Sequence, residues 1–225
     1  MDVSASVPFT DKRDFGLHIA GTWRTGTGDR REVRSPATGT LIATVAEATD
    51  KDVAAACDAA HTAFPAWAAT DTAERARLLR GLARIIADRM DGLAQLESAV
   101  TGRPIREMRA QMGRIPEWLD YFAGIILGLE GEANRVKGGF LTYTQYRPYG
   151  VCALLTPWNH PVLILVKKLA AALAAGNTLV IKPSELAPVS PLLIAEWARE
   201  AGLPDGAVNV VTGGGTAGAA LVAHS

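Results

Sequence analysis

The sequence predicts an α/β fold in which a mainly helical N-terminal half precedes a parallel sheet. Apolar residues recur at helical spacing over long segments between residues 49 and 126. Three later apolar runs lack the alternation of a half-exposed strand, and each is followed by a helical segment; they cover residues 151–155, 178–181 and 208–211. Such strands with helical crossovers are typical of a parallel sheet that helices cover on both faces.

Composition and charge exclude several classes of protein. The chain has 225 residues, with 48% hydrophobic and 20% charged, which is typical of a globular protein rather than a disordered one. Lys and Arg together number 23, as do Asp and Glu, so the net charge is zero and offers no bulk attraction for nucleic acid. The uncharged stretch 149–166 contains Pro157, Asn159 and Pro161, which would interrupt a spanning helix, so we expect no membrane segment.

Cysteine and histidine usage indicates neither a disulfide framework nor a metal site. Cys57 lies in an Ala-rich helical segment and Cys152 in an apolar run, so we interpret both as inert core thiols. The four histidines are scattered along the chain. Residues 1–16 lack the apolar region of a signal peptide, which predicts a cytoplasmic location.

The N-terminal half begins with strands and continues with helices. Alternating runs predict strands at 17–23 and 41–45. Thr49 and Asp52 have the spacing of a capping box and start a helix that we expect to end near Pro65. Helical periodicity predicts three further segments, at 72–90, at 93–101, and around 118–126 with a bend at Pro116.

Two later segments carry distinct local signals. Aromatic and hydroxyl residues alternate over 140–146, which predicts a half-exposed strand that pairs with another segment. In the helix after the second apolar run, Ser190 is the predicted N-cap and Pro191 the first helical residue, and Gly202 marks the end.

The motif TPWNHP (156–161) follows the first apolar run, at the carboxyl end of a strand, where open α/β sheets bind ligands. Its two prolines fix the backbone around Trp158 and Asn159. The Asn159 amide is an uncharged donor of the kind that stabilises a developing oxyanion. The alternative interpretation is a proline-rich turn with an Asn cap, in which His160 is structural.

Two more motifs follow the next two runs. In KPSE (182–185), Lys182 and Glu185 could both bind the hydroxyls of one ribose, or they could form an ordinary surface ion pair. The segment GGGTAG (213–218) follows a predicted strand and opens a helix, so its backbone amides could meet a phosphate. A simple tight turn is an equal alternative for the glycines.

Taken in order, IAGTW, TPWNHP, AALAAGNTLVIKPSE and GLPDGAVNVVTGGGTAG resemble the aldehyde dehydrogenase superfamily over residues 17–225. The resemblance implies an aldehyde dehydrogenase-like α/β fold, with an N-terminal helical segment, part of a Rossmann-like parallel sheet and an oligomerisation β-ribbon. It implies oxidation of an aldehyde to a carboxylic acid with NAD(P). In that chemistry a cysteine thiolate attacks the carbonyl, hydride leaves to the nicotinamide, and water activated by a glutamate hydrolyses the thioester.

The resemblance also assigns roles to residues of the three motifs. Asn159 is expected to be the catalytic oxyanion donor, and no metal is expected. Lys182 and Glu185 would hold the adenosine ribose, and the Glu185 carboxylate would repel a 2′-phosphate, so the expected cofactor is NAD rather than NADP. Gly215 would lie against the adenine. The residues implied in cofactor binding are Thr156, Pro157, Trp158, Lys182, Ser184, Glu185 and Gly215.

Three parts of the chain are expected by the same resemblance. Residues 1–135 form an N-terminal β element and the helical part of the cofactor-binding domain, 136–149 the oligomerisation strand region, and 150–225 the first βαβαβα part of the NAD-binding domain. A homodimer or homotetramer is expected. The family's second glycine motif, its glutamate base and its catalytic cysteine find no match here, so we expect an N-terminal fragment without the catalytic domain, inactive alone. The alternative is a non-catalytic module, derived from such an enzyme, that binds nucleotide or pairs with subunits.

Overall fold

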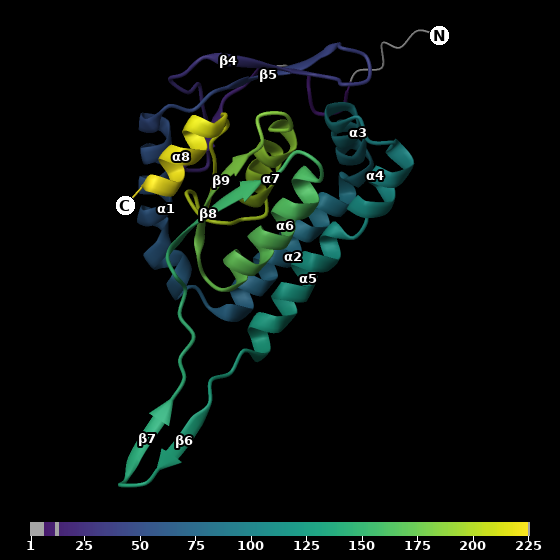
Figure 1. The fold of residues 1–225 in the computed structure, drawn as a ribbon. Helices are drawn as coiled ribbons and strands as arrows, with labels where there is room; N and C mark the ends of the chain where they lie inside the picture. Colours follow the sequence, from purple (N-terminus) through teal and green to yellow (C-terminus); the bar gives the residue numbers. More distant parts are fainter. Residues whose placement is uncertain (1–6, 12–13, 225) are drawn as a thin grey trace.

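A five-stranded mixed sheet, with helices on both faces, organises the computed structural model of the chain (Figure 1). The structure describes residues 7–11 and 14–224, so part of the N-terminal segment used to predict location, and residue 225, lie outside it. The strand order is β3-β2-β10-β9-β8. These strands are β2 (Leu17–Ile19), β3 (Thr22–Arg24), β8 (Val151–Thr156), β9 (Thr178–Pro183) and β10 (Val208–Val210).

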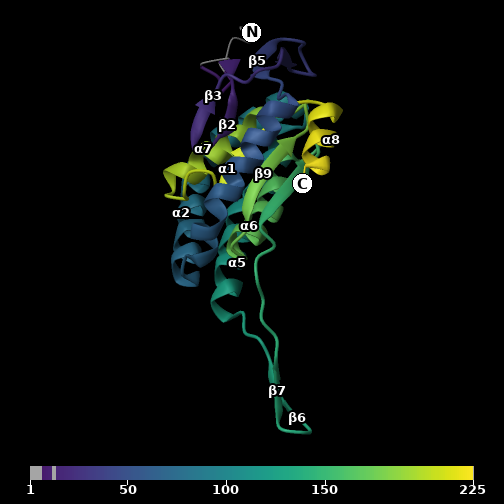
Figure 2. The same cartoon turned by 90° about the vertical axis from the view of Figure 1, so that its left-hand side faces the viewer.

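The three unalternated apolar runs form β8, β9 and β10, and the three strands are parallel, as predicted. Helices α6 and α7 pack on one face of the sheet, while α1 packs on the other face and α8 lies beside α1 and β8. Figure 2 shows α1 running across the sheet from that side. The helices are α1 (Asp50–Ala69), α6 (Pro161–Ala174), α7 (Val189–Glu200) and α8 (Gly215–Ala223).

The N-terminal strands extend this sheet, which the sequence did not indicate. β2 pairs antiparallel with β10 and with β3. Asn209, fully buried in β10, accepts a hydrogen bond from the Ala20 N–H at 2.9 Å and donates to the Leu179 carbonyl at 3.1 Å. The expected parts 1–135 and 150–225 therefore share one sheet.

A second helical layer covers α6, because α2 and α5 both pack against it. The expected single segment bent at Pro116 is wrong: two helices meet there, and Pro116 lies in the first turn of the second. A proline at that position sacrifices no helical hydrogen bond. The layer consists of α2 (Thr72–Asp88), α3 (Met90–Thr101), α4 (Ile105–Met112), α5 (Ile115–Ile125) and the short 3₁₀ helix η1 (Ile126–Gly128).

Helix α1 does not end near Pro65 but continues to Ala69, so that prediction is also wrong. Pro65 lies on the exposed side of the helix, while Trp67, two residues later on the opposite side, is fully buried. Arg75 of α2 donates hydrogen bonds to the carbonyls of Ala68 and Thr70. Burial of Trp67 and satisfaction of these carbonyls outweigh the single hydrogen bond that proline removes.

Ser190 is not the N-cap of α7, contrary to the prediction. Helix α7 starts two residues earlier than predicted, at Val189, and its cap is Pro188. The Ser190 hydroxyl instead donates to the buried carboxylate of Glu97 on α3. The Ser190 hydroxyl thus forms a tertiary hydrogen bond with Glu97 instead of a local cap on its own helix.

Two smaller sheets lie outside the central one. The first has the strand order β1-β5-β4, and the second is an antiparallel hairpin of β6 and β7 that projects away from the rest of the chain (Figures 1 and 2). Both faces of β7 are exposed, not one as the alternation predicted. The strands are β1 (Asp14–Phe15), β4 (Arg30–Arg34), β5 (Leu41–Ala46), β6 (Ala133–Val136) and β7 (Phe140–Tyr143).

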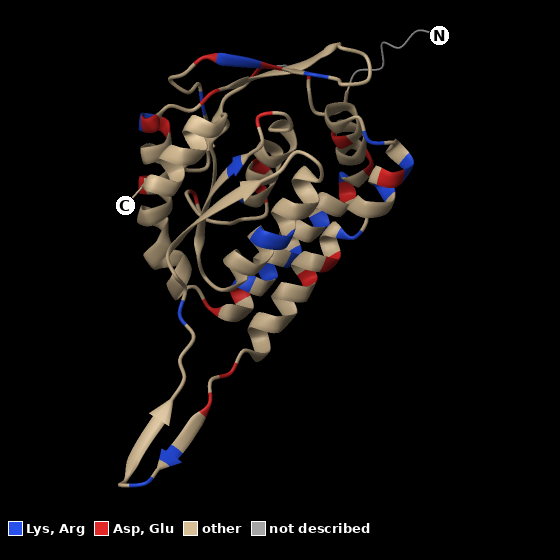
Figure 3. Cartoon of the chain, in the orientation of Figure 1, with Lys and Arg blue, Asp and Glu red and all other residues tan. Residues whose placement is uncertain are grey.

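Charged residues of both signs are scattered along the helices, whereas β7 and α8 contain none (Figure 3). Among the described residues, no helix combines the length and the apolar character needed to cross a bilayer.

Candidate functional site

The first two motifs leave the sheet side by side. In the parallel register of β8 and β9, Leu155 lies opposite Lys182 and Thr156 opposite Pro183. TPWNHP and KPSE therefore begin at the same edge, at the carboxyl ends of neighbouring strands. Parallel sheets use this edge to bind ligands, because the loops that leave it converge there.

Thr156 ends β8 with a hydroxyl that has no partner. Its side chain is only 6% exposed, and no described group forms a hydrogen bond with its Oγ1. A buried polar atom without a partner costs roughly 1–3 kcal/mol. This oxygen is therefore available to a ligand that would enter at the sheet edge.

The following residues face solvent. Trp158 is 53% exposed, and Asn159 is exposed without a hydrogen-bond partner for its amide among the described residues. His160 caps α6, and its carbonyl accepts the Ile164 N–H at 3.0 Å. Partial burial, followed by the charges of Arg103 and Lys167, lowers the pKa of His160. Asn159 is therefore free to donate, and it lies two residues before α6 begins.

Lys182 and Glu185 form an ion pair, with Nζ and Oε2 3.8 Å apart. The Lys182 side chain is 11% exposed and that of Glu185 38%, so the lysine is far from an ordinary surface charge. The Ser184 hydroxyl accepts the Leu186 N–H at 3.3 Å and closes the turn after the pair. The carboxylate and the ammonium thus lie together at the edge of the sheet, with the lysine largely buried and the glutamate partly exposed.

The glycine motif meets this pair through Gly218 rather than Gly215. A Cβ built on Gly218 would lie 3.6 Å from the Lys182 Cδ, whereas one on Gly215 would meet nothing within 4 Å. Gly214 is the N-cap residue of α8 and, as a glycine, has no side chain that could accept a hydrogen bond from the first backbone N–H groups of that helix. The resemblance assigned Gly215 to the adenine and not to Lys182, and that role stays a prediction.

A hollow of about 210 Å³ lies between the TPWNHP loop and the segment that follows KPSE. The Trp158 indole lines it together with Leu186 and Ala187, which follow KPSE. Arg34, Pro36, Val100 and Thr101 complete its wall. The structure therefore brings Thr156, Trp158, Lys182, Glu185 and Gly218 into one region.

Neither cysteine lies in that region. Cys57 is buried on α1, and Cys152 is at the start of β8, at the opposite end of the strand from Thr156. Burial raises the pKa of both thiols, and Asp58 raises that of Cys57 further. Over residues 7–11 and 14–224, no group of three or more His, Cys, Asp or Glu side chains could hold a metal ion.

Glu97 is the residue near these loops that sequence reasoning missed. It is 1% exposed, and its carboxylate accepts hydrogen bonds from the Ser190 hydroxyl and, at 3.4 Å, from the Val162 N–H. Burial raises its pKa to about 7, although both hydrogen bonds act in the opposite direction. Helical periodicity alone gives no signal for a buried carboxylate of this kind.

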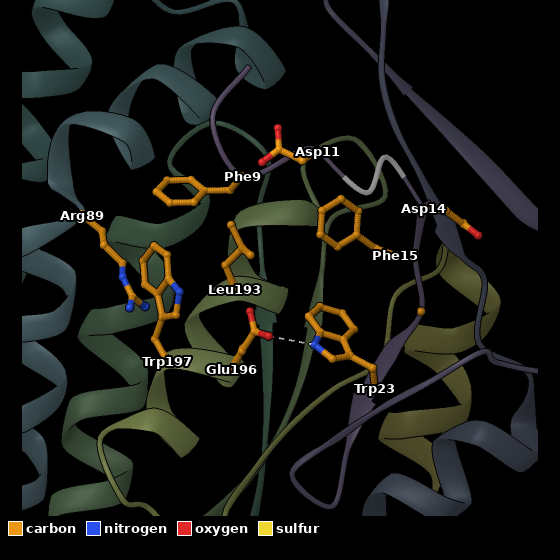
Figure 4. A pocket seen from close by; sticks show the side chains of 10 residues that line it. Phe9, Asp11, Asp14, Phe15, Trp23, Arg89, Leu193, Glu196 and Trp197 are labelled. Atoms are coloured by element: carbon orange, nitrogen blue, oxygen red, sulfur yellow. Dashed lines mark hydrogen bonds between the residues drawn. The ribbon is translucent and has the colours of Figure 1, made fainter. Parts of the chain in front are cut away.

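A separate cavity of about 570 Å³ lies between the N-terminal strands and α7 (Figure 4). The Trp23 indole N–H donates to Glu196 across it, at 3.0 Å. None of the predicted site residues lines this cavity. Its described lining is Phe9, Asp11, Asp14, Phe15, Gly16, Trp23, Arg89, Leu193, Glu196 and Trp197.

Comparison with known proteins adds sequence and structural relatives. Residues 23–225 match the profile described as aldehyde dehydrogenase family. A betaine aldehyde dehydrogenase of Vibrio vulnificus strain YJ016 is 40% identical over 199 residues, which cover 88% of this chain and 41% of the relative. The chain thus spans about two fifths of the length of the curated relatives it matches.

Solved structures agree with the sequence relatives. The crystal structure of PnpE in complex with nicotinamide adenine dinucleotide is 46% identical, with a TM-score of 0.90 over 93% of this chain and 44% of that one. The NAD⁺ complex of an aldehyde dehydrogenase from Bacillus cereus is 38% identical, with a TM-score of 0.91 over 95% of this chain and 44% of that one.

Proposed function

Because the chain belongs to the aldehyde dehydrogenase family, we propose that it supplies part of the nucleotide site and the oxyanion donor for NAD-dependent oxidation of an aldehyde to a carboxylic acid. The observation that carries this proposal is the meeting of segments 156–159, 182–185 and 213–218 at one edge of the sheet. Nucleotides bind at this edge in open α/β folds.

The groups at this edge fit a dinucleotide. The Thr156 hydroxyl lacks a partner, and the start of α8 offers backbone N–H groups at the positive end of the helix, which favours a phosphate. Lys182 can donate to a ribose hydroxyl and Glu185 can accept from one. When bound, the nicotinamide would accept a hydride from the substrate.

Asn159 would act on the substrate carbonyl. As a nucleophile attacks, negative charge develops on the carbonyl oxygen, and a prepositioned N–H donor stabilises that charge. The Asn159 amide is free of other partners among the described residues, and Pro157 and Pro161 restrict the backbone on either side. Trp158, adjacent in the chain, would line the cofactor side of the same loop.

The test is NADH formation by the native protein and its Asn159→Ala variant, over a panel of aldehydes. Loss of one oxyanion donor should lower kcat about 10²–10³-fold. The matched control is Gln95→Ala, an amide on the exposed side of α3, which should leave kcat unchanged. The 225-residue chain by itself is expected to be inactive, but if the native protein oxidises no aldehyde, or Asn159→Ala keeps its kcat, the proposal is wrong.

Cofactor choice has its own test, because Glu185 faces the proposed ribose position. The carboxylate should hydrogen-bond a free 2′-hydroxyl and repel a 2′-phosphate, which favours NAD over NADP. Glu185→Gln should therefore weaken NAD binding and strengthen NADP binding, each measured as a Kd by calorimetry. A wild-type preference for NADP would contradict this part of the proposal.

The proposal includes a homodimer or homotetramer, supported by the β6–β7 hairpin. Its apolar side chains are exposed, at 70% for Phe140, 64% for Leu141 and 71% for Tyr143. An exposed apolar surface of this kind is typical of a protein contact. Leu141→Asp should lower the mass measured by sedimentation, whereas Asn134→Asp on the paired strand should not; equal masses for all three proteins would contradict the proposal.

A further inference from the structure

The buried carboxylate of Glu97 joins two helices that follow the proposed site loops. Its Oε2 accepts the Val162 N–H at 3.4 Å, and its Oε1 accepts the Ser190 hydroxyl. Val162 is the second residue of α6, and Ser190 is the second residue of α7. One side chain from α3 therefore contacts the first turns of both helices.

Each contact is close to a site loop along the chain. Val162 comes three residues after Asn159, with only His160 and Pro161 between them, and Pro161 has a fixed φ. Ser190 comes five residues after Glu185. A displacement of either helix start would consequently carry the adjoining loop with it.

The surroundings leave Glu97 few alternative partners. Glu97, Val162 and Ser190 are at most 2% exposed, so water cannot readily replace their hydrogen bonds. No basic side chain in the described part of the chain forms an ion pair with Glu97. The first N–H groups of a helix lack intrahelical partners and carry partial positive charge, so two helix starts are suited to hold one acidic side chain.

We infer that Glu97 is a positioning residue, which fixes the starts of α6 and α7 relative to each other and thereby holds Asn159 and the Lys182–Glu185 pair in register. It acts through the two helices and does not touch the reacting atoms. The inference rests on the proposed function, because only there does the relative position of Asn159 and the Lys182–Glu185 pair matter. The hydrogen bonds of Glu97 can be tested independently of any activity.

The test is amide hydrogen exchange of the native protein, followed by mass spectrometry on peptides covering 157–164 and 184–191. Glu97→Leu replaces the carboxylate with an apolar side chain of roughly similar size, which accepts no hydrogen bond. It should accelerate exchange about 10-fold or more in both peptides and leave β9 and β10 unchanged. In Glu97→Gln the amide oxygen can accept the Val162 N–H and the amide NH2 can donate to the Ser190 hydroxyl oxygen, so exchange should stay slow in both peptides.

Two further variants keep the test decisive if Glu97→Leu fails to fold. Ser190→Ala removes one contact and should accelerate exchange at 184–191 more than at 157–164. Glu117→Gln, on the exposed side of α5, is the matched control and should change neither peptide.

The kinetic counterpart separates positioning from general stability. Ser190→Ala should raise the KM for NAD and lower kcat, whereas Glu97→Gln should stay within about 3-fold of wild type in both, because its amide can hydrogen-bond both partners. Unchanged exchange in both peptides, or acceleration spread equally over β9 and β10, would overturn the inference. If exchange changes as expected but the wild type oxidises no aldehyde, the proposed function fails while the connection through Glu97 stands.

Discussion

Arg75 on α2 should contribute more to stability than any exposed arginine of that helix. Its side chain is buried, with 7% exposure, and donates hydrogen bonds to three backbone carbonyls at the ends of two other helices. These are Ala174 at 3.1 Å, at the end of α6, and Ala68 at 3.4 Å and Thr70 at the end of α1. Such carbonyls have no intrahelical partner, so the guanidinium replaces the missing donors.

The Arg75→Met variant keeps most of the side-chain length and removes every donor. Each buried carbonyl left without a partner costs roughly 1–3 kcal/mol, and water can reach part of the α1 end, so we expect a total loss of about 3–5 kcal/mol. Arg75→Lys keeps a charge but lacks the planar set of donors, and its loss should be intermediate.

The assay is urea unfolding of the native protein, followed by far-UV circular dichroism. The matched control is Arg77→Met, on the same helix, whose exposed side chain pairs with Glu74 and should change the midpoint little. If Arg75→Met and Arg77→Met have the same midpoint, the argument that Arg75 completes the ends of α1 and α6 is refuted.

Three further outcomes follow from the structure. Pro65→Ala should raise the unfolding free energy by about 1–2 kcal/mol, because alanine restores an N–H donor inside α1; a lower urea midpoint would contradict this. Glu97 has a folded-state pKa of about 7, above its value in the unfolded chain, so the native state binds the extra proton. The stabilising contribution of this group is therefore present below the unfolded pKa and is lost as pH rises through about 7, by up to about 3 kcal/mol. Glu97→Gln does not titrate, so its stability relative to wild type should rise between about pH 5 and pH 8. A difference in urea midpoint that stays constant over this range would exclude the effect. Gly218→Val should weaken NAD binding by displacing the Lys182 side chain, while Gly218→Ala, whose Cβ fits at 3.6 Å, should leave the calorimetric Kd unchanged.

Local pattern was sufficient for the parallel part of the sheet. The runs that became β8, β9 and β10 are continuously apolar and each precedes a helical segment, which predicts burial on both faces. β9 and β10 are buried on both faces, whereas Ala153 and Leu155 of the edge strand β8 are exposed. The same patterns set TPWNHP and KPSE at strand ends. The two motifs lie close together because β8 and β9 are neighbouring parallel strands, in which Thr156 pairs with Pro183.

Prediction failed where a distant partner decided the local structure. Pro65 remained inside α1 because burial of Trp67 and the hydrogen bonds from Arg75 stabilise the turn that follows it. Ser190 lost its expected role as a cap because Glu97, far away in the sequence, accepts its hydroxyl. Neither contact leaves a periodic trace in the sequence.

The sequence by itself determined the α/β class, the order of helices and strands after residue 150, and the motifs that relate the chain to its family. These depend on the short-range spacing of residues, because helices and strands place side chains on one face at fixed intervals along the chain. Only the tertiary structure decided that β2 joins β10, that Gly218 rather than Gly215 faces Lys182, and that Glu97 connects α6 with α7. Those choices depend on which surfaces pack together, since the free energy of burying a polar group depends on the partner it finds there.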